Sequence, residues 1–319
     1  MRFILALVLL AVLACTSLFI GVSHVNLRTL LEGGMDGRAM QVLFVSRIPR
    51  TLALILAGSS MAISGLLMQM MIRNRFVEPS TVGTVESAAL GLLLATIFVP
   101  GAPMIVKMLL GALAALLGTT LFLQILRKVP LRDVLMVPLV GIMLSGVIGA
   151  ITTFIAYRWN LMPTVLAWQT GDFSGVLRGR YELLWLGMVF GVIALIAADR
   201  FTVAGMGRDF TVNLGLNYRR VVTLGLVIVS LISATVLVSV GMIPFLGLIV
   251  PNIVSLMIGD NMRRAVPWVA VLGACFVMAC DILGRVVRYP YEIPIGTVVG
   301  VIGAAIFLYL LLRKQTRAA

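Results

Sequence analysis

The chain has 319 residues, of which 61% are hydrophobic and only 12% are charged, and its mean hydropathy is +1.12. A soluble domain carries roughly 25% charged residues, so this composition excludes a soluble enzyme, a disordered tail and a large extramembrane domain. The net charge of +13 does not indicate nucleic-acid binding, because the basic residues are scattered between long apolar runs. We therefore expect a single transmembrane domain that covers residues 1–319.

Long apolar runs predict membrane-spanning helices, because a helix satisfies its own backbone hydrogen bonds inside a bilayer. The run at 3–23 continues past Cys15, which favours an uncleaved first helix over a cleavable signal. The run at 246–259 is short, and we expect Pro251 and Asn252 to interrupt it. In chain order we expect about ten spans, at residues 3–23, 51–72, 81–99, 103–126, 134–157, 182–198, 221–242, 246–259, 266–286 and 295–312.

The charges of the short loops predict that both termini are cytoplasmic, because most of the loop arginines and lysines then fall on the inner side. The outer side nevertheless keeps an excess of arginines, among them Arg47, Arg50, Arg285 and Arg288. Arginine binds carboxylates through its planar fork, so an acidic docking partner would explain this excess. Contact with lipid head groups is the alternative, and Asp281 could also pair with Arg285 one turn later.

Three connections are long enough to carry a function. Two of them, residues 24–50 and 158–181, fall on the outer side. The third, residues 199–220, is the longest inner connection, and its apolar residues are spaced as in short amphipathic helices separated by glycines such as Gly207 and Gly215. This segment either faces a cytoplasmic partner or lies on the lipid surface as a linker.

The sequence offers no catalytic or metal site. No lysine follows a glycine, so a phosphate-binding P-loop is missing, and His24 is the only histidine. We therefore expect no cofactor and no bound metal, and any active transport must take its energy from another chain or from an ion gradient. Glu86 is the main candidate for a membrane carboxylate that couples protons, but it could equally lie near a helix N-terminus or in an aqueous path.

Two blocks of the sequence resemble one transporter family in order, spacing and residue type. The first block, residues 47–79, begins with Arg47-Ile48-Pro49-Arg50, and the second, residues 247–296, begins with Gly247-Leu248-Ile249-Val250-Pro251-Asn252. With these blocks the chain resembles the permease subunits of the iron–siderophore and cobalamin class of bacterial ABC importers over nearly its whole length.

The resemblance implies an all-α, ten-helix subunit in the bacterial inner membrane that translocates a ferric-siderophore chelate by alternating access. It also implies partners: cytoplasmic ATPase subunits, a periplasmic or lipid-anchored binding protein, and a second permease subunit, which is either another copy or a sister chain. A cobalamin or haem importer is the alternative within the class. A self-sufficient secondary transporter is the alternative outside it, although such proteins normally keep more buried ionisable residues than this chain offers.

The resemblance further implies roles for particular residues. The positions that match those binding acidic residues of the binding protein are Arg47, Arg50 and Arg285. The positions that match the cytoplasmic gate are Asn74 and Phe76. The segment that resembles the ATPase-coupling loop contains Asp209, Leu214 and Gly215. The chain departs from the family pattern where Asn-Pro-Leu-Ala becomes Asn74-Arg75-Phe76-Val77 and where Pro-His becomes Pro251-Asn252.

Overall fold

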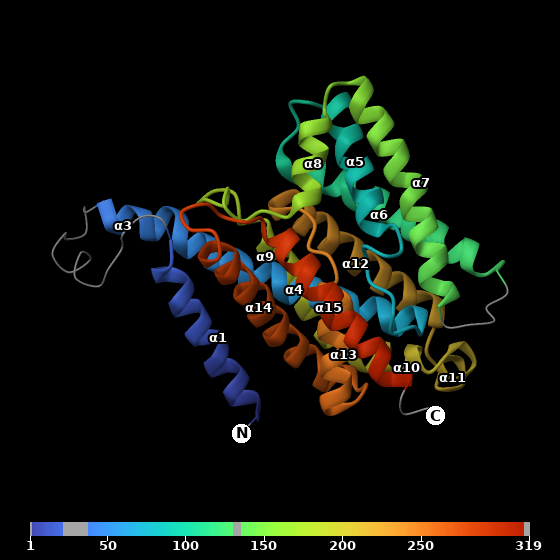
Figure 1. Ribbon diagram of the computed structural model, residues 1–319. Helices are drawn as coiled ribbons and strands as arrows, with labels where there is room; N and C mark the ends of the chain where they lie inside the picture. Colours follow the sequence, from blue (N-terminus) through green and yellow to red (C-terminus); the bar gives the residue numbers. More distant parts are fainter. Residues whose placement is uncertain (1, 22–37, 130–134, 316–319) are drawn as a thin grey trace.

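The computed structural model describes residues 2–21, 38–129 and 135–315, and it shows a bundle of helices (Figure 1). Part of the predicted outer connection 24–50, with His24, and the first residue of the predicted span 134–157 lie outside the described residues. The first helices are α1 (Arg2–Phe19), α3 (Arg38–Val42), the π-helix η1 (Leu43–Arg47), α4 (Ile48–Ile72), α5 (Thr84–Phe98), α6 (Met104–Leu126), α7 (Met136–Arg158) and α8 (Met162–Thr170). The later helices are α9 (Leu184–Ile196), α10 (Ala198–Gly205), α11 (Arg208–Asn213), α12 (Tyr218–Val240), α13 (Leu246–Ile258), α14 (Met262–Val286) and α15 (Ile295–Gln315).

The helices match the predicted membrane spans. Among the described residues, six helical stretches are long and apolar enough to cross a membrane, and the pair α9 and α10, bent by 66°, would make a seventh. Three shorter apolar helices, α5, α13 and α15, coincide with the remaining predicted spans. The prediction of an all-α, multi-pass membrane protein is confirmed, and the total of ten spans stays a prediction.

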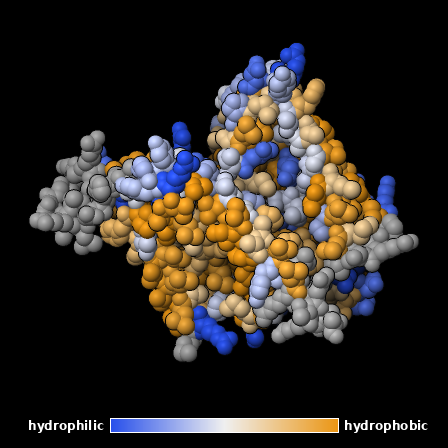
Figure 2. Space-filling view, viewed as in Figure 1, coloured by the Kyte–Doolittle hydropathy of each residue, from blue (hydrophilic) through white to orange (hydrophobic). Residues whose placement is uncertain are grey.

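The surface carries a broad apolar region, with hydrophilic residues gathered toward the two ends of the bundle (Figure 2). Large apolar side chains such as Leu113, Leu117, Leu139 and Met143 are exposed along α6 and α7, as expected of helices that face lipid. Helix α1 begins and helix α15 ends at the same end of the bundle (Figure 1). We call this the inner end, in line with the loop charges, and the opposite end the outer end.

Helix α4 runs through the middle of the bundle, where it contacts α9, α12, α13 and α14. Small residues allow the close approach. A Cβ added to Gly58 would lie 2.8 Å from the carbonyl oxygen of Gly273 on α14, and Gly65 packs directly on the backbone of Gly247 on α13. Close contact between small residues is a main source of helix association in lipid, where apolar burial gives little driving force.

Two local expectations have different outcomes. Pro251 and Asn252 do not interrupt the eighth span, because α13 continues through both residues. The inner connection 199–220 does form two short helices, α10 and α11, and its Gly207 and Gly215 have positive φ angles of 117° and 77°.

Candidate functional site

Helix α13 has a strained start and lacks one backbone hydrogen bond. Phe245, just before the helix, has a left-handed φ of 62°. Pro251 has no N–H, so it cannot donate to the carbonyl of Gly247 one turn earlier. The side chain of Gln69 on α4 supplies the missing donor, with its Nε2 3.2 Å from the Gly247 oxygen. Satisfying a carbonyl in this way is what allows a proline inside a membrane helix.

A buried carboxylate holds the same end of α13. Glu78 lies in residues 73–83, which connect α4 to α5 and which we call the inner loop, and it is only 1% exposed. Its Oε1 accepts hydrogen bonds from the backbone N–H of Phe245, at 2.9 Å, and from the hydroxyl of Ser80. Burial raises the pKa of the Glu78 carboxyl above its ordinary value, and these donors oppose the shift. A negative charge is also favourable at the N-terminal end of a helix.

The inner loop is attached to α13 at two further places. The Nδ2 of Asn252, in the middle of α13, donates to the backbone oxygen of Arg75 at 2.8 Å. The guanidinium of Arg75 pairs with Asp260, just beyond the C-terminal end of α13, at 2.6 Å. The inner loop therefore contacts the start, the middle and the end of α13.

The two predicted gate residues lie within this inner loop. Asn74 is 4% exposed, and its Oδ1 accepts a hydrogen bond from the backbone N–H of Phe76 at 2.8 Å. The ring of Phe76 is half-buried and meets the ring of Phe307 on α15 edge to face, with centroids 6.0 Å apart. The structure thus brings both residues together at the inner end, between α13 and α15, and their gating role stays a prediction.

At the outer end, Asp281 on α14 is shared by two of the predicted docking arginines. Its Oδ1 lies 2.7 Å from Nη2 of Arg50, and its Oδ2 lies 2.6 Å from Nη2 of Arg285. Arg50 also pairs with Glu292, at 2.7 Å. The expected pairing of Asp281 with Arg285 is confirmed. The side chains of Asp281 and Arg285 are almost fully buried, whereas 14% of Arg50 and 26% of Glu292 is exposed.

Arginines at this end also hold the C-terminal end of α1. Nη1 of Arg285 donates to the backbone oxygens of Ser17 and Ile20, at 3.0 and 2.7 Å, and Nη1 of Arg47 donates to the oxygen of Leu18. The last carbonyls of a helix have no partners of their own, and they attract positive charge. Arg47, Arg50 and Arg285 therefore bind groups within this chain, and their role in docking the binding protein stays a prediction.

The exposed surface beside this network is a pocket of ≈ 340 Å³, lined by Arg288, Tyr291, Glu292, Ile293 and Pro294. The guanidinium of Arg288 lies 5.9 Å from the centroid of the Tyr291 ring. An exposed cation beside an aromatic ring and a partly exposed carboxylate can take part in polar contacts with another protein.

The three predicted coupling residues lie on the surface at the inner end. Asp209 is in the first turn of α11, Leu214 follows the helix and is 57% exposed, and Gly215 turns the chain toward α12. Phe210 is a further large apolar side chain on this short helix, and it is 48% exposed. A short helix that presents apolar side chains beyond the bundle is suited to docking in a groove of a partner.

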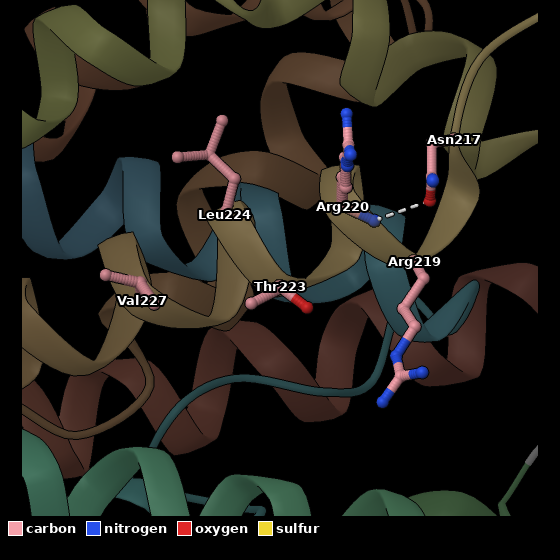
Figure 3. Close-up of a pocket in the computed structure, with 6 residues that line it drawn as sticks. All are labelled: Asn217, Arg219, Arg220, Thr223, Leu224 and Val227. Atoms are coloured by element: carbon pink, nitrogen blue, oxygen red, sulfur yellow. Dashed lines mark hydrogen bonds between the residues drawn. The ribbon is translucent and has the colours of Figure 1, made fainter.

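A pocket whose lining includes two arginines lies on the first turns of α12 (Figure 3). Its volume is ≈ 540 Å³, and its lining residues are Asn217, Arg219, Arg220, Thr223, Leu224 and Val227. The Asn217 side chain accepts a hydrogen bond from the backbone N–H of Arg220, which caps α12. Helix α11 contacts α12, whose first turns carry these two arginines.

The coupling segment also contacts the inner loop. Gly207 precedes α11, and a Cβ added to it would lie 3.2 Å from Nη1 of Arg73, the first residue of the inner loop. Nearby, Gly205 packs against Met70, near the end of α4. Arg73, which precedes the predicted gate residue Asn74 in the sequence, therefore lies beside the residue that begins the approach to α11.

Glu86 lies in the first turn of α5 and is half-buried, which confirms the expectation that it could lie near a helix N-terminus. Among the described residues, no group of three or more histidine, cysteine, aspartate or glutamate side chains could hold a metal ion. Sequence reasoning missed the roles of Gln69 and Glu78. The available signals were Pro251, which leaves one carbonyl without a donor, and a carboxylate in an otherwise apolar stretch.

Comparison with known proteins agrees with this architecture. The sequence model of the FecCD transport family matches residues 9–313. The chain is 49% identical to the petrobactin import system permease protein YclN of Bacillus subtilis, over 98% of both chains. It is 41% identical to the petrobactin import system permease protein FatD of Bacillus anthracis, over 98% of this chain and 91% of that one. A solved structure, described as an inward-facing conformation of a metal-chelate type ABC transporter, aligns with a TM-score of 0.81 at 24% identity, over 98% of this chain and 99% of the other.

Proposed function

Because the chain belongs to the FecCD transport family, we propose that it is the membrane permease of an ABC importer that carries a ferric siderophore of the petrobactin type through the cytoplasmic membrane by alternating access. The observation that carries this proposal is the 49% identity, over 98% of both chains, to a petrobactin import permease. The relatives are permease subunits, so this chain is a transport subunit and not an enzyme. A cobalamin or haem cargo is the less favoured alternative.

The proposed energy source is ATP hydrolysis in separate ATPase subunits. The exposed helix α11, with Phe210 and Leu214, supports this, because it gives such a subunit a place to bind at the inner end. The pocket on the first turns of α12, with Arg219 and Arg220, favours acidic side chains around the partner's binding site. Contact between Gly207 and Arg73 gives a route from this surface to the predicted gate.

The proposed gate is the inner loop with Asn74 and Phe76, in a complex of two permease subunits. Phe76 contacts α15 and Asn252 holds the neighbouring Arg75, so a shift of either helix changes the position of the gate residues. Whether the second subunit is a copy of this chain or a sister chain does not alter this arrangement.

The proposed docking surface for the binding protein is the exposed rim of the outer network. Arg50 and Glu292 remain partly exposed, and Arg288 and Tyr291 line the adjoining pocket. Arg47 and Arg285 stabilise this surface, because their guanidinium groups donate hydrogen bonds to backbone oxygens at the end of α1. Individual exposed ion pairs contribute only about 0.2–1 kcal/mol, so several pairs must act together to orient a partner.

Gene disruption combined with affinity purification tests the proposal. Cells without this permease should lose uptake of iron-55-labelled petrobactin and regain it when the chain is restored. The tagged permease, purified from its native membrane, should bring an ATPase subunit with it. If uptake of this chelate is unchanged in the disrupted cells, the cargo assignment is wrong, and if no ATPase subunit co-purifies, a self-sufficient transporter becomes the better account.

A further inference from the structure

We infer that Glu78 is a positioning residue that makes the inner loop and helix α13 move as one body. The inference rests on the proposed function in one respect. The inner loop contains the predicted gate residues Asn74 and Phe76, so on the proposed function the gate moves together with α13. The coupling of loop and helix itself is a property of this chain alone.

The contact made by Glu78 joins segments that are distant in the sequence. Glu78 and Phe245 are 167 residues apart, so this hydrogen bond is tertiary and does not belong to a local turn. The neighbouring Val77 and Val82 are both 0% exposed, which places the carboxylate in an apolar part of the inner loop. A buried carboxylate is costly unless donors surround it. The start of α13 supplies the N–H of Phe245 to Oε1, whereas Oε2 is buried without a hydrogen-bond partner among the described residues.

The backbone at the start of α13 is closely packed around this contact. Gly247 packs against Gly65 on α4, and a Cβ added to it would lie 3.3 Å from Oε2 of Glu78. Phe245 is held in a left-handed conformation, which is unfavourable for a bulky residue and persists only where its surroundings impose it. The Glu78 carboxylate, bound to the N–H of Phe245, is one of the groups that impose it.

The three attachments of the loop are unequal. The pair of Arg75 with Asp260 is about half exposed, with side chains 43% and 54% accessible, so solvent weakens it. The bond from Asn252 to Arg75 also lies in an exposed setting. The bond from Phe245 to Glu78 is the least exposed of the three, because the Glu78 side chain is only 1% accessible, and water replaces such a bond less readily. Glu78 is therefore the attachment whose loss should free the loop.

Distance measurements between spin labels on the two segments test the inference. Labels are attached through Arg73→Cys in the inner loop and Met257→Cys on α13, both exposed positions, after the native cysteines have been replaced by alanine. The labelled permease is measured in lipid nanodiscs, both alone and with its partner ATPases with and without a nucleotide analogue. The variants are Glu78→Ala, Glu78→Gln, and Glu86→Gln as a matched control on a neighbouring carboxylate.

The inference predicts a single narrow distance distribution in the parent chain that does not change with nucleotide. Glu78→Ala should add a second, broader population, because the hydrogen bond of a buried side chain is lost. The state in which the inner loop is detached from α13 should be roughly tenfold more populated than in the parent chain. Glu78→Gln should stay narrow, since its amide oxygen can still accept from Phe245, and Glu86→Gln should have no effect. A narrow distribution in Glu78→Ala, or a distance in the parent chain that changes with nucleotide, would overturn the inference.

A second comparison covers the case in which the alanine variant does not assemble. Glu78→Asp has a carboxylate that is one methylene shorter, so it should bind Phe245 poorly and broaden the distribution, whereas Glu78→Gln should not. Equal widths in these two variants would overturn the inference. Because both comparisons can be read in the permease alone, they do not depend on whether ATPase subunits co-purify, which tests the proposed function separately.

Discussion

Asp281 is the carboxylate that two guanidinium groups share at the outer end, and it is almost fully buried. Asp281→Ala leaves Arg285 buried without its counter-charge, and removing one partner of a buried ion pair typically costs about 3–5 kcal/mol. We therefore expect a clear fall in the thermal unfolding temperature of the purified permease, followed by intrinsic fluorescence at a fixed scan rate. Glu292→Ala is the matched control, because Glu292 is partly exposed and should have a much smaller effect. Equal shifts in the two variants would contradict the shared role of Asp281.

Gln69 and Pro251 offer a second test at the residue scale, because one compensates for the other. Gln69→Leu removes the donor to the Gly247 carbonyl and should destabilise the protein by about 1–3 kcal/mol. Pro251→Ala restores a backbone N–H at the position that normally serves this carbonyl. In a double-mutant cycle read by thermal unfolding, Gln69→Leu should therefore cost less in the Pro251→Ala background. Additive effects would show that the two residues do not share the carbonyl.

At the scale of elements, the turn after α11 is the place where a small change should affect coupling but not folding. Gly215 has a φ of 77° and an added Cβ would meet nothing within 4 Å, so Gly215→Val strains only the backbone, by roughly 1–2 kcal/mol. Gly179, in the outer connection, has a φ of 93° and the same open surroundings, which makes Gly179→Val a matched control. We expect Gly215→Val to lower transport per ATP hydrolysed in the reconstituted complex, and Gly179→Val to change it little. The same ratio in both variants would remove α11 from the coupling route.

Most elements could be predicted from hydropathy, and the polar contacts between them could not. The apolar runs indicate the membrane helices because the bilayer selects for length and composition alone. Pro251 predicts a break in the helix because its local effect is unfavourable, but the donor that compensates for it comes from Gln69 on another helix. The pair of Asp281 with Arg285, one turn apart on α14, could be predicted from the sequence. The contacts of Arg50 with Asp281 and of Arg285 with the end of α1 could not, because these partners come close only in the folded bundle.

At the scale of the whole molecule, the outer surface should bind its partner through exposed charge. Arg288→Glu reverses an exposed residue of the outer pocket and leaves the buried network intact. We expect it to weaken binding-protein association, most clearly at low salt, where screening is slight. Arg264→Glu, an exposed reversal at the inner end, is the control. Equal affinities for Arg288→Glu and the parent complex at low ionic strength would place the docking surface elsewhere.

The importer assignment is tested most directly by flux through the isolated complex. The permease is reconstituted in lipid vesicles with its co-purified ATPase subunits and its binding protein, and the entry of iron-55-labelled petrobactin is measured. We predict accumulation that requires both ATP and the binding protein, and that stops when either is omitted. Accumulation without ATP, driven by a proton or sodium gradient through this chain alone, would contradict the account.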